Sequence, residues 1–112
     1  KNTFRYINLV KWLMEYKISS IVAVISPFEK DRDVCRKEIK NYKEIYLSCS
    51  LEERIKRDKK KLYIPALKGE KKHVVDVDIP FDIPKKSELS IDTEKREPNS
   101  IAEEIIQKLK LL

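Results

Sequence analysis

Glycine is almost absent from this sequence. Gly69 is the single glycine among 112 residues, whereas an average globular chain contains about 7%. Segments rich in tight turns therefore have little glycine to use. The chain also begins at Lys1 rather than at a methionine. Together these two facts predict a larger protein of which residues 1–112 are a part, and the length of 112 residues fits about one domain.

Cysteine and histidine are scarce as well. Cys35 and Cys49 form no C-x-x-C pair, and His73 is the only histidine. This pattern excludes a disulfide framework and lacks the ligand spacing of a zinc site. We therefore expect buried free thiols and no bound metal.

Long apolar stretches are missing too. No run approaches the roughly 18 apolar residues that span a bilayer, and the start of the chain shows no secretory signal. The composition, 41% apolar and 39% charged, suits a globular protein. We expect a cytoplasmic protein without a membrane partner.

The charge balance is basic. The chain carries 25 basic and 19 acidic residues, a net charge of +6. Such a charge favours phosphate-bearing partners without choosing among them. Nucleic acid is disfavoured because the lysine-rich stretch 56–72 holds one aromatic residue, Tyr63, and no RNA-binding or zinc-finger motif occurs. That stretch suits either a solubilising loop or a lid that closes on nucleotide phosphates.

Apolar periodicity predicts strands that alternate with helices. The β-branched run I-S-S-I-V-A-V-I, residues 18–25, is typical of a strand buried on both faces. We expect helices over 2–16, 27–39, 51–58 and 97–112, and strands over 18–25, 42–50 and 88–92. In the last helix, Ser100 and Glu103 would form a capping box.

The lysine-rich connection over 58–84 is too long for an ordinary loop, and its three prolines break any long regular element. A mobile lid fits this length. The alternation of strands and helices around it predicts a parallel α/β sheet with right-handed crossovers. In such sheets, ligands bind beyond the carboxyl ends of the strands.

The segment S-P-F-E, which begins at Ser26, has two interpretations. Ser26 could be the N-cap of a helix, with Pro27 at the first position and Glu29 completing a capping box. Its hydroxyl could instead bind an anion or accept a phosphoryl group. Arg32 and Arg36 share the next helix face, where they suit phosphate recognition or pairing with neighbouring acids.

Five segments, in order, resemble the adenylylsulfate kinase family. They are K-N…R at 1–5, I-S-P-F…D-R-D..R at 25–36, L…K-R-D.K.L-Y..A..G-E.K at 51–72, V-D.P-F..P at 77–84 and E-L-S-I-D-T at 88–93. The match is collinear across nearly the whole chain, which is more specific than any single motif. It implies a P-loop-type α/β fold, a parallel sheet flanked by helices. It also implies that residues 1–112 are a single domain of this family, incomplete at its N-terminus, with a lid over 58–84.

The resemblance also implies an activity and its residues. The family transfers the γ-phosphoryl group of MgATP to the 3′-hydroxyl of adenosine 5′-phosphosulfate, in sulfate assimilation, and is expected to act as a homodimer. Nucleotide-binding residues would be Arg57 and Thr93. Substrate-binding residues would be Asn2, Arg5, Ile25, Ser26, Lys60 and Val74. Ser26 is also the expected catalytic residue, either as a substrate-positioning hydroxyl or as a phosphoserine.

The sequence departs from the family pattern in two places. No G-x-x-G-x-G-K-[ST] loop occurs in these residues, and the segment that carries it would also supply the central strand, so the remaining strands would expose sheet edges. In the lid, H-V-V-D at 73–76 replaces the usual Gly-Phe-Thr-Gly, so Val74 stands where an aromatic ring stacks on the substrate base. Two alternatives therefore remain: a kinase for another modified nucleotide, such as cytidine diphosphoramidate in capsule biosynthesis, and a non-catalytic binding domain.

Overall fold

The computed structural model describes residues 2–111, which divide into two compact units. Unit 1 contains the described residues up to 43 together with 73–84. Unit 2 contains 44–72 and the described residues from 85 onward. The predicted lid over 58–84 is therefore shared between the units, and the single domain over 1–112 stays a prediction.

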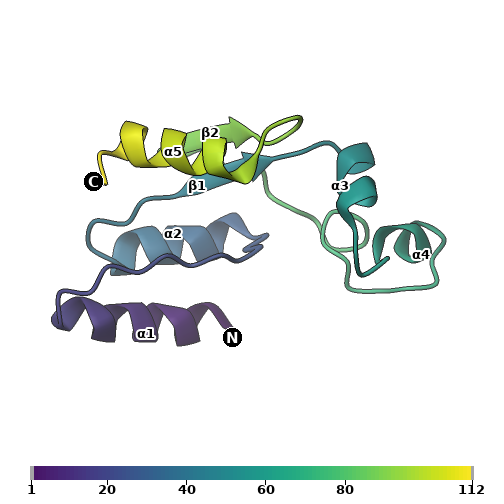
Figure 1. Cartoon of the computed structure of the whole chain (residues 1–112). Helices are drawn as coiled ribbons and strands as arrows, with labels where there is room; N and C mark the ends of the chain where they lie inside the picture. Colours follow the sequence, from purple (N-terminus) through teal and green to yellow (C-terminus); the bar gives the residue numbers. More distant parts are fainter. Residues whose placement is uncertain (1, 112) are drawn as a thin grey trace. The chain divides into compact units, whose positions relative to one another are not determined.

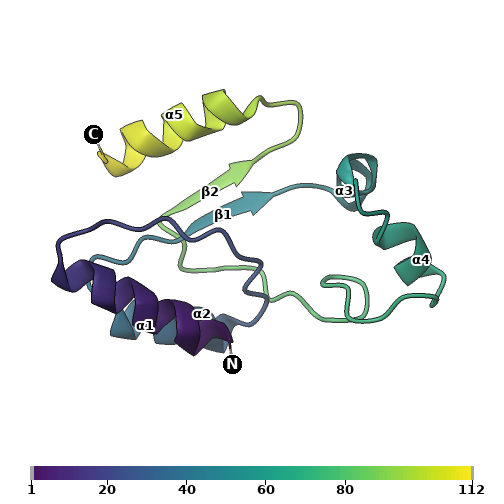
Figure 2. The same ribbon diagram turned by 60° about the horizontal axis from the view of Figure 1, so that its bottom comes forward.

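Two helices form the body of unit 1. Helix α1, Asn2–Glu15, and helix α2, Glu29–Glu38, lie side by side in both ribbon views (Figures 1 and 2). Ile7 and Val10 of α1 are buried, as is Cys35 of α2. The helical spacing of apolar residues in α1 makes this packing possible, because residues three or four apart share one face of a helix. Both helices confirm the prediction.

The predicted strand over 18–25 is wrong for the described chain. Residues 18–28 carry no regular secondary structure. Ile21 is 98% exposed and Ile25 is 65% exposed. A β-strand needs a neighbour to accept and donate its backbone hydrogen bonds, and within residues 2–111 the sheet consists of two other strands. A β-branched run without such a neighbour does not form a ladder.

Unit 2 is built on a parallel pair of strands. Strand β1, Ile45–Ser48, and strand β2, Leu89–Asp92, run in the same direction with Ile45 opposite Leu89 and Ser48 opposite Asp92 (Figure 2). Ile91 is buried at 3% exposure while Ser90 and Asp92 are exposed, the alternation expected of a strand with one covered face. The predicted parallel pairing is confirmed.

Two short helices follow β1 in unit 2 (Figure 1). Helix α3, Leu51–Arg57, is capped by Ser50, whose hydroxyl accepts a hydrogen bond from the Glu53 N–H at 3.2 Å. Helix α4, Tyr63–Leu67, was not predicted. Its Pro65 lies in the first turn, where no intrahelical N–H is needed, so the proline does not prevent it. The Asp58 carboxylate joins the two helices by accepting from the Leu62 and Tyr63 N–H groups at 2.6 and 2.9 Å.

Helix α5, Pro98–Leu109, closes unit 2, and Ile101 on it is buried. The predicted capping box at Ser100 and Glu103 is wrong, because the helix already begins at Pro98 with Glu97 as its N-cap. The fixed φ of a proline suits the first helical position and so starts the helix earlier than the serine would. The Ser100 hydroxyl instead accepts a hydrogen bond from Arg96 at 3.0 Å. Among the described helices, none is long and apolar enough to cross a membrane.

Candidate functional site

Arg57 and Thr93, both predicted on the nucleotide side, lie in direct contact in unit 2. Arg57 ends α3, and Thr93 follows β2 directly. The Arg57 Nη2 donates to the Thr93 carbonyl oxygen at 3.1 Å, and Nη1 lies 3.4 Å from the Thr93 hydroxyl. On its other side, Arg57 Nε donates to the Glu53 carboxylate at 2.8 Å. The guanidinium plane is therefore held from two directions.

Thr93 is anchored to the end of β1. Its hydroxyl and its backbone N–H both donate to the Ser48 carbonyl oxygen, at 3.0 and 2.9 Å. Thr93 is buried, at 9% exposure. Because Ser48 and Asp92 are the last residues of the two strands, Arg57 is held at the carboxyl edge of the parallel pair. This is the edge at which α/β folds bind ligands.

A pocket of about 430 Å³ opens beside this pair. Its polar wall is made by Arg57, Thr93 and Arg96. Its apolar wall comes from β1 and α5, through Leu47, Pro98, Ile101, Ala102 and Ile105. Pockets of this size that combine apolar walls with a few fixed polar groups are typical small-ligand sites. Guanidinium groups beside an apolar wall suit a ligand with an anionic part and a flat, apolar part.

Arg96 lines the pocket but was not predicted as a site residue, because it lies outside the five segments that resemble the family. Its Nη1 donates to the Glu104 carboxylate at 2.9 Å, and this hydrogen bond holds the pKa of Glu104 below its ordinary value. Nearby, the Glu94 carboxylate accepts from the Ser50 N–H at 2.8 Å, and hydrogen bonding to Ser50 lowers the pKa of Glu94. Arg96 is thus paired with an ionised carboxylate, Glu104, and Glu94 is a second ionised carboxylate near this end of the strands.

Ser26 does not cap α2, so that prediction is wrong. Ser26 has a φ of 44° in the left-handed region. Helix α2 begins three residues later, with Phe28 as its N-cap and no hydrogen bond from the cap side chain. The Glu29 N–H, which begins the helix, donates instead to the Asp82 carboxylate at 2.9 Å. Asp82, 53 residues along the chain, thus takes the capping position that local rules gave to Ser26.

Arg32 and Arg36 are engaged with the protein itself. Arg32 is 5% exposed, and its two terminal nitrogens donate to the carbonyl oxygens of Ser26 and Asp82. Arg36 donates to the Asp33 carboxylate at 2.8 Å, and its guanidinium lies 5.6 Å from the Tyr42 ring centre. Of the two interpretations of these arginines, the geometry supports pairing within the fold over phosphate recognition.

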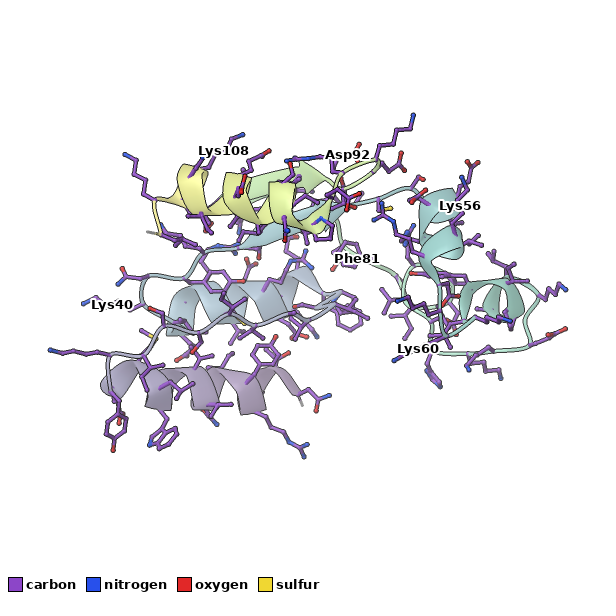
Figure 3. All side chains as sticks on the ribbon, viewed as in Figure 1. Lys40, Lys56, Lys60, Phe81, Asp92 and Lys108 are labelled. Atoms are coloured by element: carbon purple, nitrogen blue, oxygen red, sulfur yellow. The ribbon has the colours of Figure 1, made fainter. Side chains whose placement is uncertain are left out.

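The other predicted site residues are distributed over both units. Asn2, Arg5 and Ile25 are exposed in unit 1, where Val74 is buried at 9% exposure. Lys60 is exposed between α3 and α4 of unit 2 (Figure 3). The structure brings Arg57 and Thr93 together, and the roles of the others stay predictions.

Val74 begins a tight turn whose geometry depends on Asp78. The Asp78 carboxylate accepts hydrogen bonds from the His73 and Val74 N–H groups at 2.5 and 2.6 Å. His73 and Asp76 take left-handed φ angles of 62° and 67°. Removal from water would raise the pKa of Asp78, but the backbone hydrogen bonds outweigh this and hold it below the ordinary value of 3.8.

This lowered pKa predicts a turn that loosens in acid. A carboxyl whose pKa is lower in the folded state stabilises the structure above its ordinary pKa and stops doing so as the pH falls through the lowered value. We therefore expect the amide resonance of Val74, whose N–H donates to this carboxylate, to shift as the pH falls below 3.8. Asp78→Asn should abolish this titration, whereas Glu70→Gln should leave it unchanged. A titration that persists in Asp78→Asn would contradict the assignment.

Across residues 2–111, no group of three or more His, Cys, Asp or Glu side chains is placed to hold a metal ion. Neither Cys35, which is buried, nor Cys49, which is partly exposed, forms a disulfide. The polar side chains that line the pocket carry guanidinium and hydroxyl groups. Such groups act on a ligand by hydrogen bonding and charge.

A parallel α/β unit with cationic and hydroxyl groups at its carboxyl edge fits a P-loop-type fold. The fold matches the solved structure of the Mycobacterium tuberculosis APS kinase CysC in complex with AMPPNP and APS. The TM-score is 0.88 at 27% identity, over 97% of this chain and 65% of that one. The profile of the adenylylsulphate kinase family matches residues 1–92, and the chain belongs to this family.

Curated relatives carry two different names. A probable adenylyl-sulfate kinase of Pyrococcus abyssi is 37% identical over 106 residues, 95% of this chain and 61% of that protein. A cytidine diphosphoramidate kinase of Campylobacter jejuni is 43% identical over 104 residues, 90% of this chain and 59% of that protein. The chain thus spans about three fifths of the length of these relatives.

Proposed function

We propose that the protein transfers the γ-phosphoryl group of ATP to the 3′-hydroxyl of adenosine 5′-phosphosulfate. The observation that carries this proposal is the contact between Arg57 and Thr93 at the carboxyl edge of the parallel strands, beside the pocket of about 430 Å³. Membership of the adenylylsulphate kinase family supports it. So does the likeness to a kinase solved with AMPPNP and APS.

In the proposed reaction, the acceptor oxygen bonds to the γ-phosphorus as the bond from that phosphorus to the β,γ-bridging oxygen breaks. ADP leaves, and the proton of the 3′-hydroxyl is released. Mg²⁺ enters with ATP as part of the substrate. Such transfers depend on positioning and charge stabilisation more than on covalent help from the protein. A guanidinium fixed by Glu53 and Thr93 provides both without having to reorganise.

A second acceptor is favoured by one observation in the lid. Val74 is a buried aliphatic residue, so it offers no aromatic ring for stacking on an adenine. The Campylobacter jejuni relative that is 43% identical is a cytidine diphosphoramidate kinase. Base stacking on an aromatic ring contributes about 1–3 kcal/mol, which is enough to alter the choice between acceptors. The alternative is thus a kinase of the same mechanism that acts on a cytidine-based nucleotide.

The two acceptors are distinguished by one assay. Residues 1–112 contain no G-x-x-G-x-G-K-[ST] motif, so the assay uses the protein as its gene encodes it. ADP release is coupled to a spectrophotometric reaction, with adenosine 5′-phosphosulfate or cytidine diphosphoramidate as acceptor. We expect at least tenfold higher kcat/KM with adenosine 5′-phosphosulfate. The reverse ratio would support the cytidine alternative, and no ADP release with either acceptor would support a non-catalytic binding domain.

A further inference from the structure

We propose that Arg32 is a positioning residue that clamps the turn at Ser26 to the end of the lid segment at Phe81 and Asp82. The role rests on the proposed function and on the prediction that Ser26 is a substrate-binding residue. It goes beyond that function because Arg32 would act on acceptor binding through the turn, by holding the carbonyl oxygens of Ser26 and Asp82.

The clamp begins with the two terminal nitrogens of one guanidinium. Arg32 Nη1 donates to the Ser26 carbonyl oxygen at 2.7 Å, and Nη2 donates to the Asp82 carbonyl oxygen at 2.6 Å. The same guanidinium lies 5.7 Å from the centre of the Phe81 ring, which is labelled in Figure 3. These bonds join parts of the chain that are 50 residues apart in sequence. Arg32 is 5% exposed and both hydrogen bonds are partly buried, which strengthens them relative to bonds in water.

Asp82 completes the clamp from the other side. Its N–H donates to the Pro27 carbonyl oxygen at 2.8 Å. Its carboxylate accepts from the Glu29 N–H at 2.9 Å. The backbone from Ser26 to Glu29 is thus fixed at three successive points by two residues, Arg32 and Asp82.

The turn needs such a clamp because of its backbone geometry. Ser26 has a φ of 44°, a conformation that residues other than glycine disfavour unless their surroundings impose it. The bond from Arg32 holds the carbonyl group of Ser26 itself. A planar guanidinium with two parallel donors can bridge two carbonyl groups, whereas a lysine ammonium is a single point charge on a flexible stem.

The clamp also couples any movement of the turn at Ser26 to movement of the lid segment around Asp82. Asp82 lies near the end of the predicted lid, 58–84, within the part that belongs to unit 1. Because the turn and this stretch share four hydrogen bonds through Arg32 and Asp82, a change in one is transmitted to the other. Arg32 would therefore set acceptor binding rather than ATP binding.

The test compares Arg32→Lys with Arg36→Lys in the protein as its gene encodes it. Arg36 lies on the same helix and pairs with Asp33 instead of the turn. We expect Arg32→Lys to speed amide hydrogen exchange at Glu29 and Asp82 at least tenfold, and to raise the KM for the acceptor about tenfold. The KM for ATP should stay within twofold. Arg36→Lys should leave all three quantities within twofold of the wild type.

A second variant tests the clamp in case Arg32→Lys does not fold. Asp82 is exposed, so Asp82→Ala should fold, and it should speed exchange at Glu29 while raising the KM for the acceptor. Unchanged exchange and an unchanged acceptor KM in both variants would overturn the clamp, as would an equal rise in both KM values. If wild-type protein transfers no phosphoryl group, the proposed function fails by itself, and the exchange rates still decide whether Arg32 holds the turn.

Discussion

Replacing Arg57 with lysine is expected to raise the KM for ATP about tenfold in the active protein, with the KM for the acceptor within twofold of the wild type. The guanidinium reaches Thr93 and Glu53 at the same time, and an ammonium cannot make both contacts in that geometry. A lysine that is no longer held in this position is expected to lose one charge-assisted hydrogen bond to the ATP phosphates. The lower end of the usual cost of such a bond, about 1.5 kcal/mol, corresponds to about tenfold in affinity. Steady-state kinetics with each substrate varied in turn measures the two KM values.

Arg54→Lys is the matched control for this experiment. Arg54 lies one turn earlier on α3, and its guanidinium rests 5.6 Å from the Tyr63 ring centre, away from the residues that line the pocket. We expect its KM for ATP to stay within twofold of the wild type. If Arg57→Lys folds normally and binds ATP as the wild type does, Arg57 is not a nucleotide-binding residue.

The parts of the fold that were predictable are those fixed by near neighbours in sequence. Helical spacing of apolar residues predicted α1, and the segment 88–92 was predicted as a short strand, which the structure forms as β2. Side chains three or four apart on a helix, or two apart on a strand, share one face, so such patterns lie within a few neighbouring residues. They need no knowledge of the rest of the chain.

The mistaken predictions concern features that depend on distant partners. The run over 18–25 has strong β propensity, but a strand exists only when another strand pairs with it. The cap of α2 is a similar case, since Ser26 satisfied every local rule while Asp82, 53 residues away, accepts the Glu29 N–H instead. Local sequence patterns show which groups need a partner, and tertiary structure decides which partner they obtain.

The residues of the candidate site were likewise only partly predictable from the sequence. Arg57 and Thr93 were assigned through the family resemblance, and the structure places them in contact. Arg96 was missed because no motif includes it, although it lines the same pocket. The role of Arg32 could not be deduced either, since an arginine beside a helix N-terminus suits phosphate binding and backbone clamping equally well until its acceptors are known.

Replacing Ser26 with alanine is expected to lower kcat about tenfold without abolishing phosphoryl transfer and without a loss of stability. The tenfold loss corresponds to one hydrogen bond of about 1.4 kcal/mol between the hydroxyl and the acceptor. Stability should change by less than about 0.5 kcal/mol, because a side chain that caps no helix loses no capping energy on truncation, and α2 has no cap from Ser26. Urea unfolding and steady-state kinetics measure the two quantities.

Ser26→Gly separates the hydroxyl from the backbone of the turn. Glycine takes the φ of 44° without steric cost, a relief of about 1 kcal/mol that offsets its greater entropy loss on folding. We therefore expect Ser26→Gly to be at least as stable as Ser26→Ala and to show a similar kcat. A phosphoserine at position 26 that forms with ATP alone and disappears when acceptor is added would show instead that Ser26 carries the phosphoryl group. In that case both variants would lose transfer completely, because neither retains an oxygen on which the intermediate could form.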